Sequence, residues 1–157
     1  MKYLVRWCLQ SDLDMIASIE LKSFEFPLEY DDFIMCLKRE DHVGLVVEHE
    51  FKVVGFMLYQ IKKEHYNLIS IAVAPDFRRK NAGTALINYL KKTIKTRIKL
   101  IISDEKKEAH CFFKKNNFIA IKVLHEHFGP HHDGYEFVYD RVSKPKCKIK
   151  RGAGELG

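Results

Sequence analysis

Apolar residues recur at helical spacing in four parts of the chain and at strand spacing in seven others. The helices are expected around Leu13–Phe24, Phe33–Leu37 and Leu86–Ile94 and at about residues 105–115. The strands are expected at Tyr3–Cys8, Val43–Val47, Val53–Ile61, Leu68–Val73, Ile98–Ser103, Phe118–Leu124 and Gly134–Asp140. This β-α-α-β-β-β-α-β-α-β-β order predicts an α/β fold, with one mixed sheet flanked by helices.

Local signals place several of the boundaries. Ser11 or Asp12 is expected to cap the first helix, and Pro27 cannot continue it. The segment "EHEFK" (48–52) is typical of a hairpin between two strands. In the third helix, the apolar residues of Leu86–Ile94 are expected to face inward and the lysines outward.

The length of 157 residues and the distribution of charge predict one domain, residues 1–143, followed by a flexible basic tail, residues 144–157. The chain has a net charge of +6, and the tail contributes five basic residues and one acidic residue to it. The remaining 22 basic and 20 acidic residues nearly balance, so a nucleic-acid-binding face is not expected.

No apolar run approaches the roughly 20 residues of a membrane helix, so no membrane partner is expected. The first residues, "MKYLVRWCLQSDLD", have too short an apolar stretch for a signal peptide, which leads us to expect a cytoplasmic protein. The four cysteines show no Cys-x-x-Cys spacing, so neither a disulfide framework nor a structural zinc site is expected.

The segment "APDFRRKNAGTALI" (74–87) joins a strand to a helix and combines positive charge with small residues. A helix N-terminus exposes unpaired N–H groups and favours phosphate, and Ala82 and Gly83 add little bulk there. Asn81 tolerates a left-handed backbone better than most residues. The segment lacks both the P-loop and the three-glycine dinucleotide patterns, so its residues alone are compatible with an anion site or with a basic helix cap.

The longer segment "SIAVAPDFRRKNAGTALI" (70–87) resembles the acetyl-CoA-binding motif of the GNAT superfamily of N-acetyltransferases. Arg78 holds the motif's Arg/Gln position, Asn81 its first Gly and Gly83 its second. The segment "AHCFFKKNNF" (109–118) then resembles the family's second motif. The resemblance implies an N-acetyltransferase that uses acetyl-CoA as its acetyl donor. It implies a cofactor site formed by the backbone of Ile71, Ala72 and Val73 and by Arg78, Arg79, Lys80, Asn81, Ala82, Gly83 and Thr84.

The segment "IELKSFEFPLEYDDF" (19–33) is similar to the substrate-binding loop of protein N-terminal acetyltransferases, including the ribosomal-protein alanine acetyltransferases. This resemblance implies that Phe26, Pro27, Leu28 and Tyr30 bind the substrate's first residues. The alternative is that Phe26 and Leu28 only anchor a bend to the core. The segment "HFGPHHDGYEFV" (127–138) is similar to the hairpin that closes the other side of the peptide groove.

The sequence departs from that branch where its catalytic groups lie. Ile101 stands where the catalytic Glu is usual, and Phe113 stands where a Tyr donates a proton to the leaving thiolate. Lys106 replaces an Asn that contacts the cofactor, and Asn117 replaces a Gly. Cofactor binding is expected to tolerate these changes better than the usual acid/base assignment, so no catalytic residue is assigned.

The polar residues Ser103, Glu64 and His65 are candidates to hold a water that takes the proton, although each is also typical of an ordinary strand end. His125 and His127 are expected on one strand face with His131 and His132 beyond, but no spacing completes a metal site, and none is expected. The chain is therefore expected to acetylate an amine, with a protein N-terminus favoured. A lysine or small-molecule acetyltransferase and a weakened acyl-CoA-binding module remain alternatives.

Overall fold

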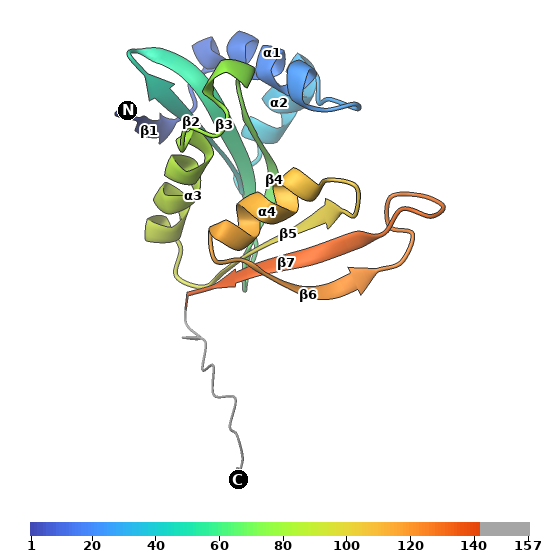
Figure 1. Ribbon diagram of the computed structural model, residues 1–157. Helices are drawn as coiled ribbons and strands as arrows, with labels where there is room; N and C mark the ends of the chain where they lie inside the picture. The colour runs from blue at the N-terminus through green and yellow to red at the C-terminus, as the bar shows by residue number, and fades with distance from the viewer. Residues whose placement is uncertain (142–157) are drawn as a thin grey trace.

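The structure, a computed structural model, describes residues 1–141, which form one mixed sheet with two helices against each face (Figure 1). The elements are β1 (Leu4–Trp7), η1 (Gln10–Asp12), α1 (Leu13–Ser23), α2 (Tyr30–Leu37), β2 (His42–His49), β3 (Lys52–Ile61), β4 (Tyr66–Val73), η2 (Pro75–Phe77), α3 (Ala82–Thr93), β5 (Arg97–Ser103), α4 (Lys107–Lys115), β6 (Ile119–Leu124) and β7 (Gly134–Asp140). The predicted order of strands and helices is confirmed, and the expected tail lies outside the described residues.

The strands lie in the order β1-β2-β3-β4-β5-β7-β6. Among the described strands, β4 and β5 form the parallel pair and all other neighbours are antiparallel. The sheet therefore consists of a first antiparallel part, β1 to β4, and a second antiparallel part, β5, β7 and β6, which meet at the β4–β5 pair.

Helices α1 and α2 cover one face of the first part of the sheet. Leu13, Ile16 and Ile19 of α1 and Phe33 of α2 form a buried cluster with residues of β2, β3 and β4. Met35 of α2 is 65% exposed, because the inner face of this short helix is centred on Phe33. Burial of one face holds each helix against the sheet.

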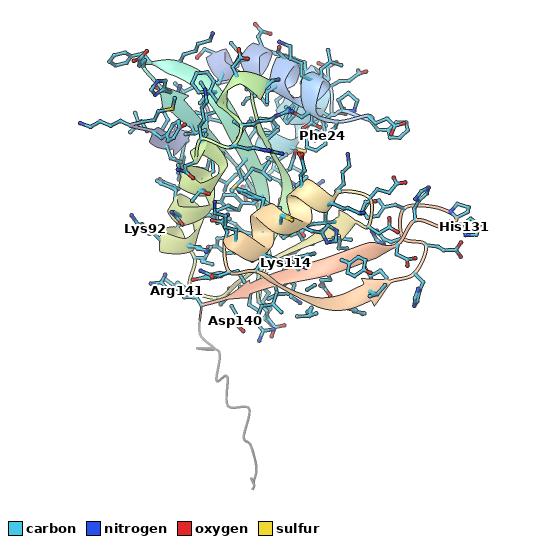
Figure 2. The ribbon with its side chains drawn as sticks, in the orientation of Figure 1. Phe24, Lys92, Lys114, His131, Asp140 and Arg141 are labelled. Atoms are coloured by element: carbon cyan, nitrogen blue, oxygen red, sulfur yellow. The ribbon has the colours of Figure 1, made fainter. Side chains whose placement is uncertain are left out.

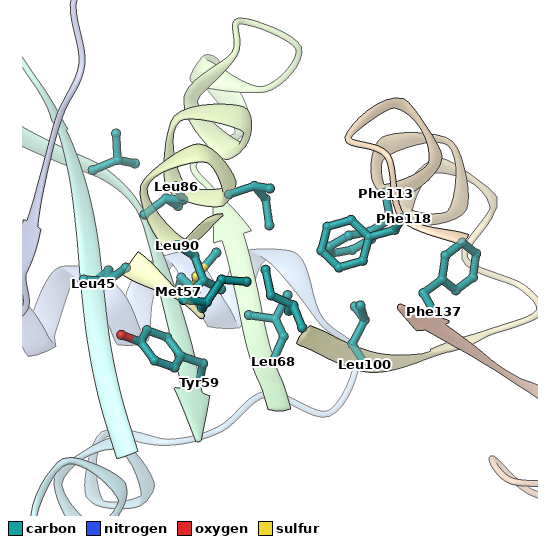
Figure 3. Close-up of a cluster of buried hydrophobic side chains, with 14 of the residues drawn as sticks. Leu45, Met57, Tyr59, Leu68, Leu86, Leu90, Leu100, Phe113, Phe118 and Phe137 are labelled. Atoms are coloured by element: carbon teal, nitrogen blue, oxygen red, sulfur yellow. The ribbon is translucent and has the colours of Figure 1, made fainter. Parts of the chain in front are cut away.

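Helices α3 and α4 cover the opposite face, and their buried side chains form a second cluster (Figure 3). Leu86, Ile87 and Leu90 of α3 and Ile94 just after it are fully buried, as their spacing predicted. Phe113 of α4 lies in the same cluster, beside Phe118 just before β6 and beside residues of β5 and β7. One cluster thus holds both parts of the sheet together.

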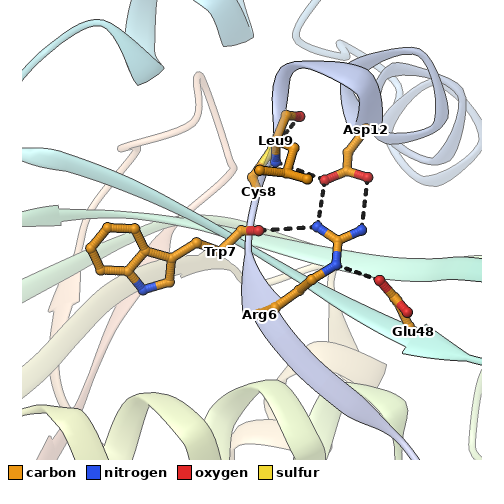
Figure 4. A network of polar contacts seen from close by, with 6 residues as sticks. All are labelled: Arg6, Trp7, Cys8, Leu9, Asp12 and Glu48. Carbon is orange, nitrogen blue, oxygen red and sulfur yellow. Dashed lines mark hydrogen bonds and ion pairs between the residues drawn. The ribbon is translucent and has the colours of Figure 1, made fainter. Parts of the chain in front are cut away.

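The start of α1 is held differently from the prediction. The Asp12 side chain makes no capping bond to α1; it accepts two hydrogen bonds from the Arg6 guanidinium, at 2.8 and 3.0 Å, and one from the Leu9 amide (Figure 4). Arg6 also pairs with Glu48 on β2. The hydrogen bond from Arg6 lowers the pKa of Asp12. The carboxylate therefore anchors η1 to the first two strands instead of capping the helix.

Two connections confirm the local signals. The β2–β3 hairpin turns through Glu50 (φ 50°) and Phe51 (φ 66°), and two such residues in sequence suit the twist of a tight hairpin. Helix α1 ends at Ser23, because Phe24 is already extended, and Pro27 lies in the connection to α2.

Candidate active site

The parallel strands β4 and β5 diverge after only two pairs of residues. Tyr66 pairs with Ile98 and Asn67 with Lys99, and no later pair follows along the two strands. On the other edge of β4, Tyr59 pairs with Leu68 and Leu58 with Ser70, so that Ile69 is an extra, bulged residue. A bulge bends the strand that contains it, so it turns β4 away from β5 at the point where their pairing stops.

The edge of β4 that faces this opening has backbone groups that β5 does not pair with, and of these the Val73 carbonyl accepts a hydrogen bond from Arg78. The amide of Ala74 donates to the carbonyl of Val54 on β3 at 2.8 Å. Backbone direction alternates along a strand, so the groups of Ala72 also turn toward β3, and those of Ile71 and Val73 turn toward the opening. Of the three residues expected to pair with the cofactor arm, Ile71 and Val73 have the required direction, and Ala72 does not.

The turn after β4 points several backbone amides in one direction. Asn81 has φ 70° and lies just before α3, which confirms its expected left-handed backbone. Arg79 is also left-handed, with φ 60°, which the sequence did not suggest. Alternating left- and right-handed residues form concave groups of N–H donors that bind anions.

The first turn of α3 adds further donors. Its first hydrogen bond joins the Ala85 amide to the Asn81 carbonyl, so the amides of Ala82, Gly83 and Thr84 have no partner within the helix. These free amides lie at the positive end of the helix dipole. The turn and the helix start together fit the phosphates of a nucleotide cofactor.

The three basic side chains of the turn differ in their contacts. Arg78 donates to the Val73 carbonyl at 2.9 Å and to the Ser23 hydroxyl at 3.0 Å, so it joins β4 to the end of α1. Arg79 pairs with Glu108 of α4 at 2.9 Å, and Lys80 lies 5.8 Å from the centre of the Phe77 ring. Arg78 thus has a structural contact, whereas Arg79 and Lys80 remain on the surface beside the amides.

The glycine of the turn makes room for a neighbouring ring. A Cβ atom at Gly83 would lie 3.0 Å from Cζ of Phe112 on α4 and 3.7 Å from a methyl group of Val73. The sequence interpretation assigned this space to a phosphate. In the structure, the ring of Phe112 occupies it and packs α4 against the start of α3.

Residues from the start of the chain brace the same turn. The Tyr3 hydroxyl donates to the Lys80 carbonyl at 2.6 Å. The Tyr3 ring contacts His49, with ring centres 5.8 Å apart, and His49 contacts Phe77 in turn, at 5.5 Å. Sequence reasoning missed this brace because no local pattern relates residues 77 positions apart.

The α1–α2 connection differs from an apolar pocket. Leu28 and Tyr30 pack against the cluster under α1 and α2, whereas Phe26 is 87% exposed and Pro27 is half-buried. Of the four expected substrate residues, Phe26 is thus the one presented to solvent. For Leu28, the alternative of a core anchor is the one that its packing supports.

Glu20 of α1 holds this connection to the sheet. Its buried carboxylate accepts hydrogen bonds from the Leu28 amide at 2.9 Å and from the Ser70 hydroxyl of β4 at 3.0 Å. Burial raises the pKa of Glu20. At the end of α1, the ring of Phe24 faces α4, where Lys106 lies 6.0 Å from its centre (Figure 2). These contacts connect α1 to both sides of the opening.

The histidines after β6 do not form the expected strand face. Strand β6 ends at Leu124, so His125 and His127 lie in the loop, with His131 near its tip (Figure 2). His125 lies 3.7 Å from Asp133, and His132 lies 3.3 Å from Glu105. Residues 1–141 contain no group of three or more His, Cys, Asp or Glu side chains that could hold a metal ion.

The residues considered for proton transfer have different surroundings. The Ser103 hydroxyl accepts a hydrogen bond from the Glu105 amide, and burial lowers the pKa of His65. Phe113, at the position of the family's Tyr, is 3% exposed and packs edge-on against Phe112 and Phe118. A substrate amine therefore has no direct access to Phe113 in this structure.

A seven-stranded sheet whose parallel pair diverges beside a phosphate-suited turn fits an acyltransferase that uses a coenzyme A thioester. Residues 2–118 match the sequence model described as the Acetyltransferase (GNAT) family, and the chain belongs to this family. It is therefore an N-acetyltransferase that uses acetyl-CoA.

Two comparisons extend this result. The chain is 27% identical over 150 residues to an N-alpha-acetyltransferase from Sulfolobus acidocaldarius, with 85% of this chain and 89% of the relative covered. It is similar in fold to the ribosomal-protein-S18-alanine N-acetyltransferase from Escherichia coli, with a TM-score of 0.80, 18% identity and coverage of 93% of this chain and 98% of that one.

A third comparison concerns the cofactor. The Arabidopsis thaliana NAA60 structure in complex with acetyl-CoA has a TM-score of 0.77 and 19% identity, with 90% of this chain and all of that chain (100%) covered.

Within residues 1–141, no helix combines the length and apolar character needed to cross a membrane.

Proposed function

We propose that this enzyme acetylates the N-terminal α-amine of a protein or peptide. The observation that carries the proposal is the similarity to relatives named N-alpha-acetyltransferase along most of both chains. The structure adds two loops suited to an extended peptide. The α1–α2 connection and the β6–β7 loop project on the same side of the molecule (Figure 1), and the first presents Phe26.

The proposed cofactor site uses the free backbone groups and the turn. The backbone of Ile71 and the amide of Val73 would hold the pantetheine arm, and the amides from Arg79 to Thr84 would hold the phosphates. The charges of Arg79 and Lys80 would add to the positive potential there. Bound acetyl-CoA supplies an activated acetyl thioester at the opening between β4 and β5.

The chemistry of the acceptor also favours an α-amine, because the attacking nitrogen must be neutral. An α-amine with a pKa near ~8 is roughly 20% neutral at pH 7.4, whereas a lysine with a pKa near ~10.4 is roughly 0.1% neutral. An enzyme without an ionisable residue at Ile101 needs less help from a base when its substrate is an α-amine.

The test compares two peptides of matched sequence. One has a free α-amine and no lysine, and the other is blocked at its N-terminus and contains one lysine. With acetyl-CoA and purified enzyme, mass spectrometry should detect the mass gain of one acetyl group in place of a hydrogen, and the first peptide should show it at the higher rate. Faster acetylation of the blocked lysine peptide would overturn the proposal. A panel that varies the first residue would then define the specificity.

A further inference from the structure

The register between β5 and β7 places a carboxylate next to the opening. Ile101 on β5 pairs directly with Glu136 on β7, and paired residues of antiparallel strands have side chains on the same face. Ile101 lies two residues beyond Lys99, the last residue of β5 that pairs with β4. Strands are about 4.8 Å apart, a distance that a Glu side chain can span. Glu136 can therefore reach across Ile101 toward the opening.

The face of the sheet that carries Ile101 and Glu136 is exposed to solvent at Ile101 and is covered by the β6–β7 loop near Gly134. The side chain of Ile101 is 38% exposed, and so is Ile69 on the β4 side of the opening. Toward the start of β7, a Cβ atom at Gly134 would meet Ile101, His127 and Phe128 at 2.8 to 3.2 Å. The β6–β7 loop thus folds over Gly134 and leaves Glu136 beside an accessible apolar surface.

Among the described residues, the contact of the Glu136 carboxylate is an electrostatic one with His65. The Glu136 side chain is half-buried, and it makes no hydrogen bond or ion pair with any of residues 1–141. By contrast, the carboxylate of Glu20 already accepts two hydrogen bonds and is 3% exposed. A partly buried carboxylate gains from binding a cation, because burial without a partner costs free energy.

We propose that the carboxylate of Glu136 holds the incoming α-ammonium group and takes its proton. This inference rests on the proposed function. The ammonium nitrogen gives one proton to Glu136, and its lone pair then forms the C–N bond to the acetyl carbonyl carbon. The C–S bond breaks with its electrons on sulfur, and the nitrogen's second proton ends on that sulfur as a thiol. Glu136 returns its proton to water.

The charged groups around Glu136 come from four neighbouring elements. Lys122 lies directly opposite on β6, Lys99 lies two residues from Ile101 on the same face of β5, and His127 lies at Gly134 in the β6–β7 loop. In the β3–β4 turn, His65 interacts electrostatically with Glu136 and also with Lys62 and Glu64.

The test uses Glu136→Gln in the full chain, which keeps the shape of the side chain and removes its charge. We expect kcat/KM for the α-amine peptide to fall about 10²-fold while the Kd for acetyl-CoA, measured by calorimetry, stays unchanged. The Kd of the same peptide, measured with coenzyme A present, should rise. The remaining activity should increase with pH up to the amine's own pKa near ~8. Glu136→Asp should retain more activity than Glu136→Gln.

The control is Glu40→Gln, a change at an exposed residue between α2 and β2, which should leave all of these values unchanged. Unchanged kcat/KM and peptide Kd in a folded Glu136→Gln protein would overturn the role of Glu136 and would leave the proposed function standing. If the unmodified enzyme acetylates no peptide N-terminus, the proposed function itself fails.

Discussion

The hydroxyl of Tyr3 donates a hydrogen bond to the carbonyl oxygen of Lys80 at 2.6 Å, joining the start of the chain to the turn between β4 and α3. Lys80 lies between the left-handed residues Arg79 and Asn81. The bond therefore braces the part of the backbone whose amides are proposed to bind phosphate.

We expect Tyr3→Phe to raise the Kd for acetyl-CoA about 3- to 10-fold, since one hydrogen bond contributes roughly 0.5–1.5 kcal/mol. The KM for the amine substrate should not change, because the loss is confined to the cofactor turn. Calorimetry and steady-state kinetics measure the two effects. Tyr89→Phe is the control, because the Tyr89 hydroxyl makes no hydrogen bond to another of residues 1–141.

Glu108 is expected to compete with the cofactor for Arg79. Both side chains of this pair are exposed, at 83% and 88%, so the pair itself adds little stability. Glu108→Gln should lower the Kd for acetyl-CoA about threefold at low salt, and the gain should vanish near 1 M salt, where screening is nearly complete. Glu40→Gln, at an exposed residue between α2 and β2, is the matched control. An unchanged Kd at low salt would show that Arg79 does not meet the phosphates.

The contact between Gly83 and Phe112 predicts an interaction between two substitutions. Gly83→Ala adds helix propensity, worth up to about 1 kcal/mol, but its Cβ atom would lie 3.0 Å from the Phe112 ring. We expect Gly83→Ala alone to destabilise the protein and weaken acetyl-CoA binding, and to be better tolerated with Phe112→Leu. Urea unfolding of the two single variants and the double variant should give a coupling free energy above about 0.5 kcal/mol. Simple additivity would contradict this packing argument.

Phe26 and Tyr30 are expected to respond differently to truncation. Phe26→Ala removes an 87% exposed ring, so it should raise the KM for the peptide about fivefold or more and leave the melting temperature unchanged. Tyr30→Ala removes a ring that packs under α1 and α2, so it should lower the melting temperature by several degrees, or about 1 kcal/mol or more. A raised KM for the peptide with an unchanged melting temperature in Tyr30→Ala would show that Tyr30 belongs to the substrate site.

The buried Glu20 predicts a dependence of stability on pH. Burial raises its pKa in the folded protein above the ordinary value of 4.5, so the folded state binds the proton more tightly than the unfolded chain. Its contribution to stability is therefore complete below that ordinary pKa and is lost as the pH rises through the folded pKa.

Glu20→Gln cannot ionise, and its amide can still accept from Leu28 and donate to Ser70. The free energy of unfolding of Glu20→Gln, relative to the unmodified protein, should thus be higher at pH 7 than at pH 4. Urea unfolding at the two pH values measures this difference. If the free energies of unfolding of the two proteins differ by the same amount at pH 4 and at pH 7, Glu20 does not titrate between these pH values.

The sequence by itself determined the order of the elements, the inner face of α3 and the residue before that helix that accepts a left-handed backbone. These features are local: helical spacing identifies the buried face at Leu86 and Leu90, and Asn81 accepts a backbone that most residues avoid. The same kind of signal placed the β2–β3 hairpin and the end of α1 close to their observed positions.

The tertiary structure alone determined which distant residues meet. The period of a strand shows which residues share a face, but it does not show which residue of the next strand lies opposite, so the Ile101–Glu136 pair could not be predicted. Phe112 and Phe113 are neighbours of the same type, and only the packing of α4 sends one toward Gly83 and buries the other. Leu28 packs against the core for a similar reason, because the buried Glu20 carboxylate holds its amide and fixes the α1–α2 connection against the sheet.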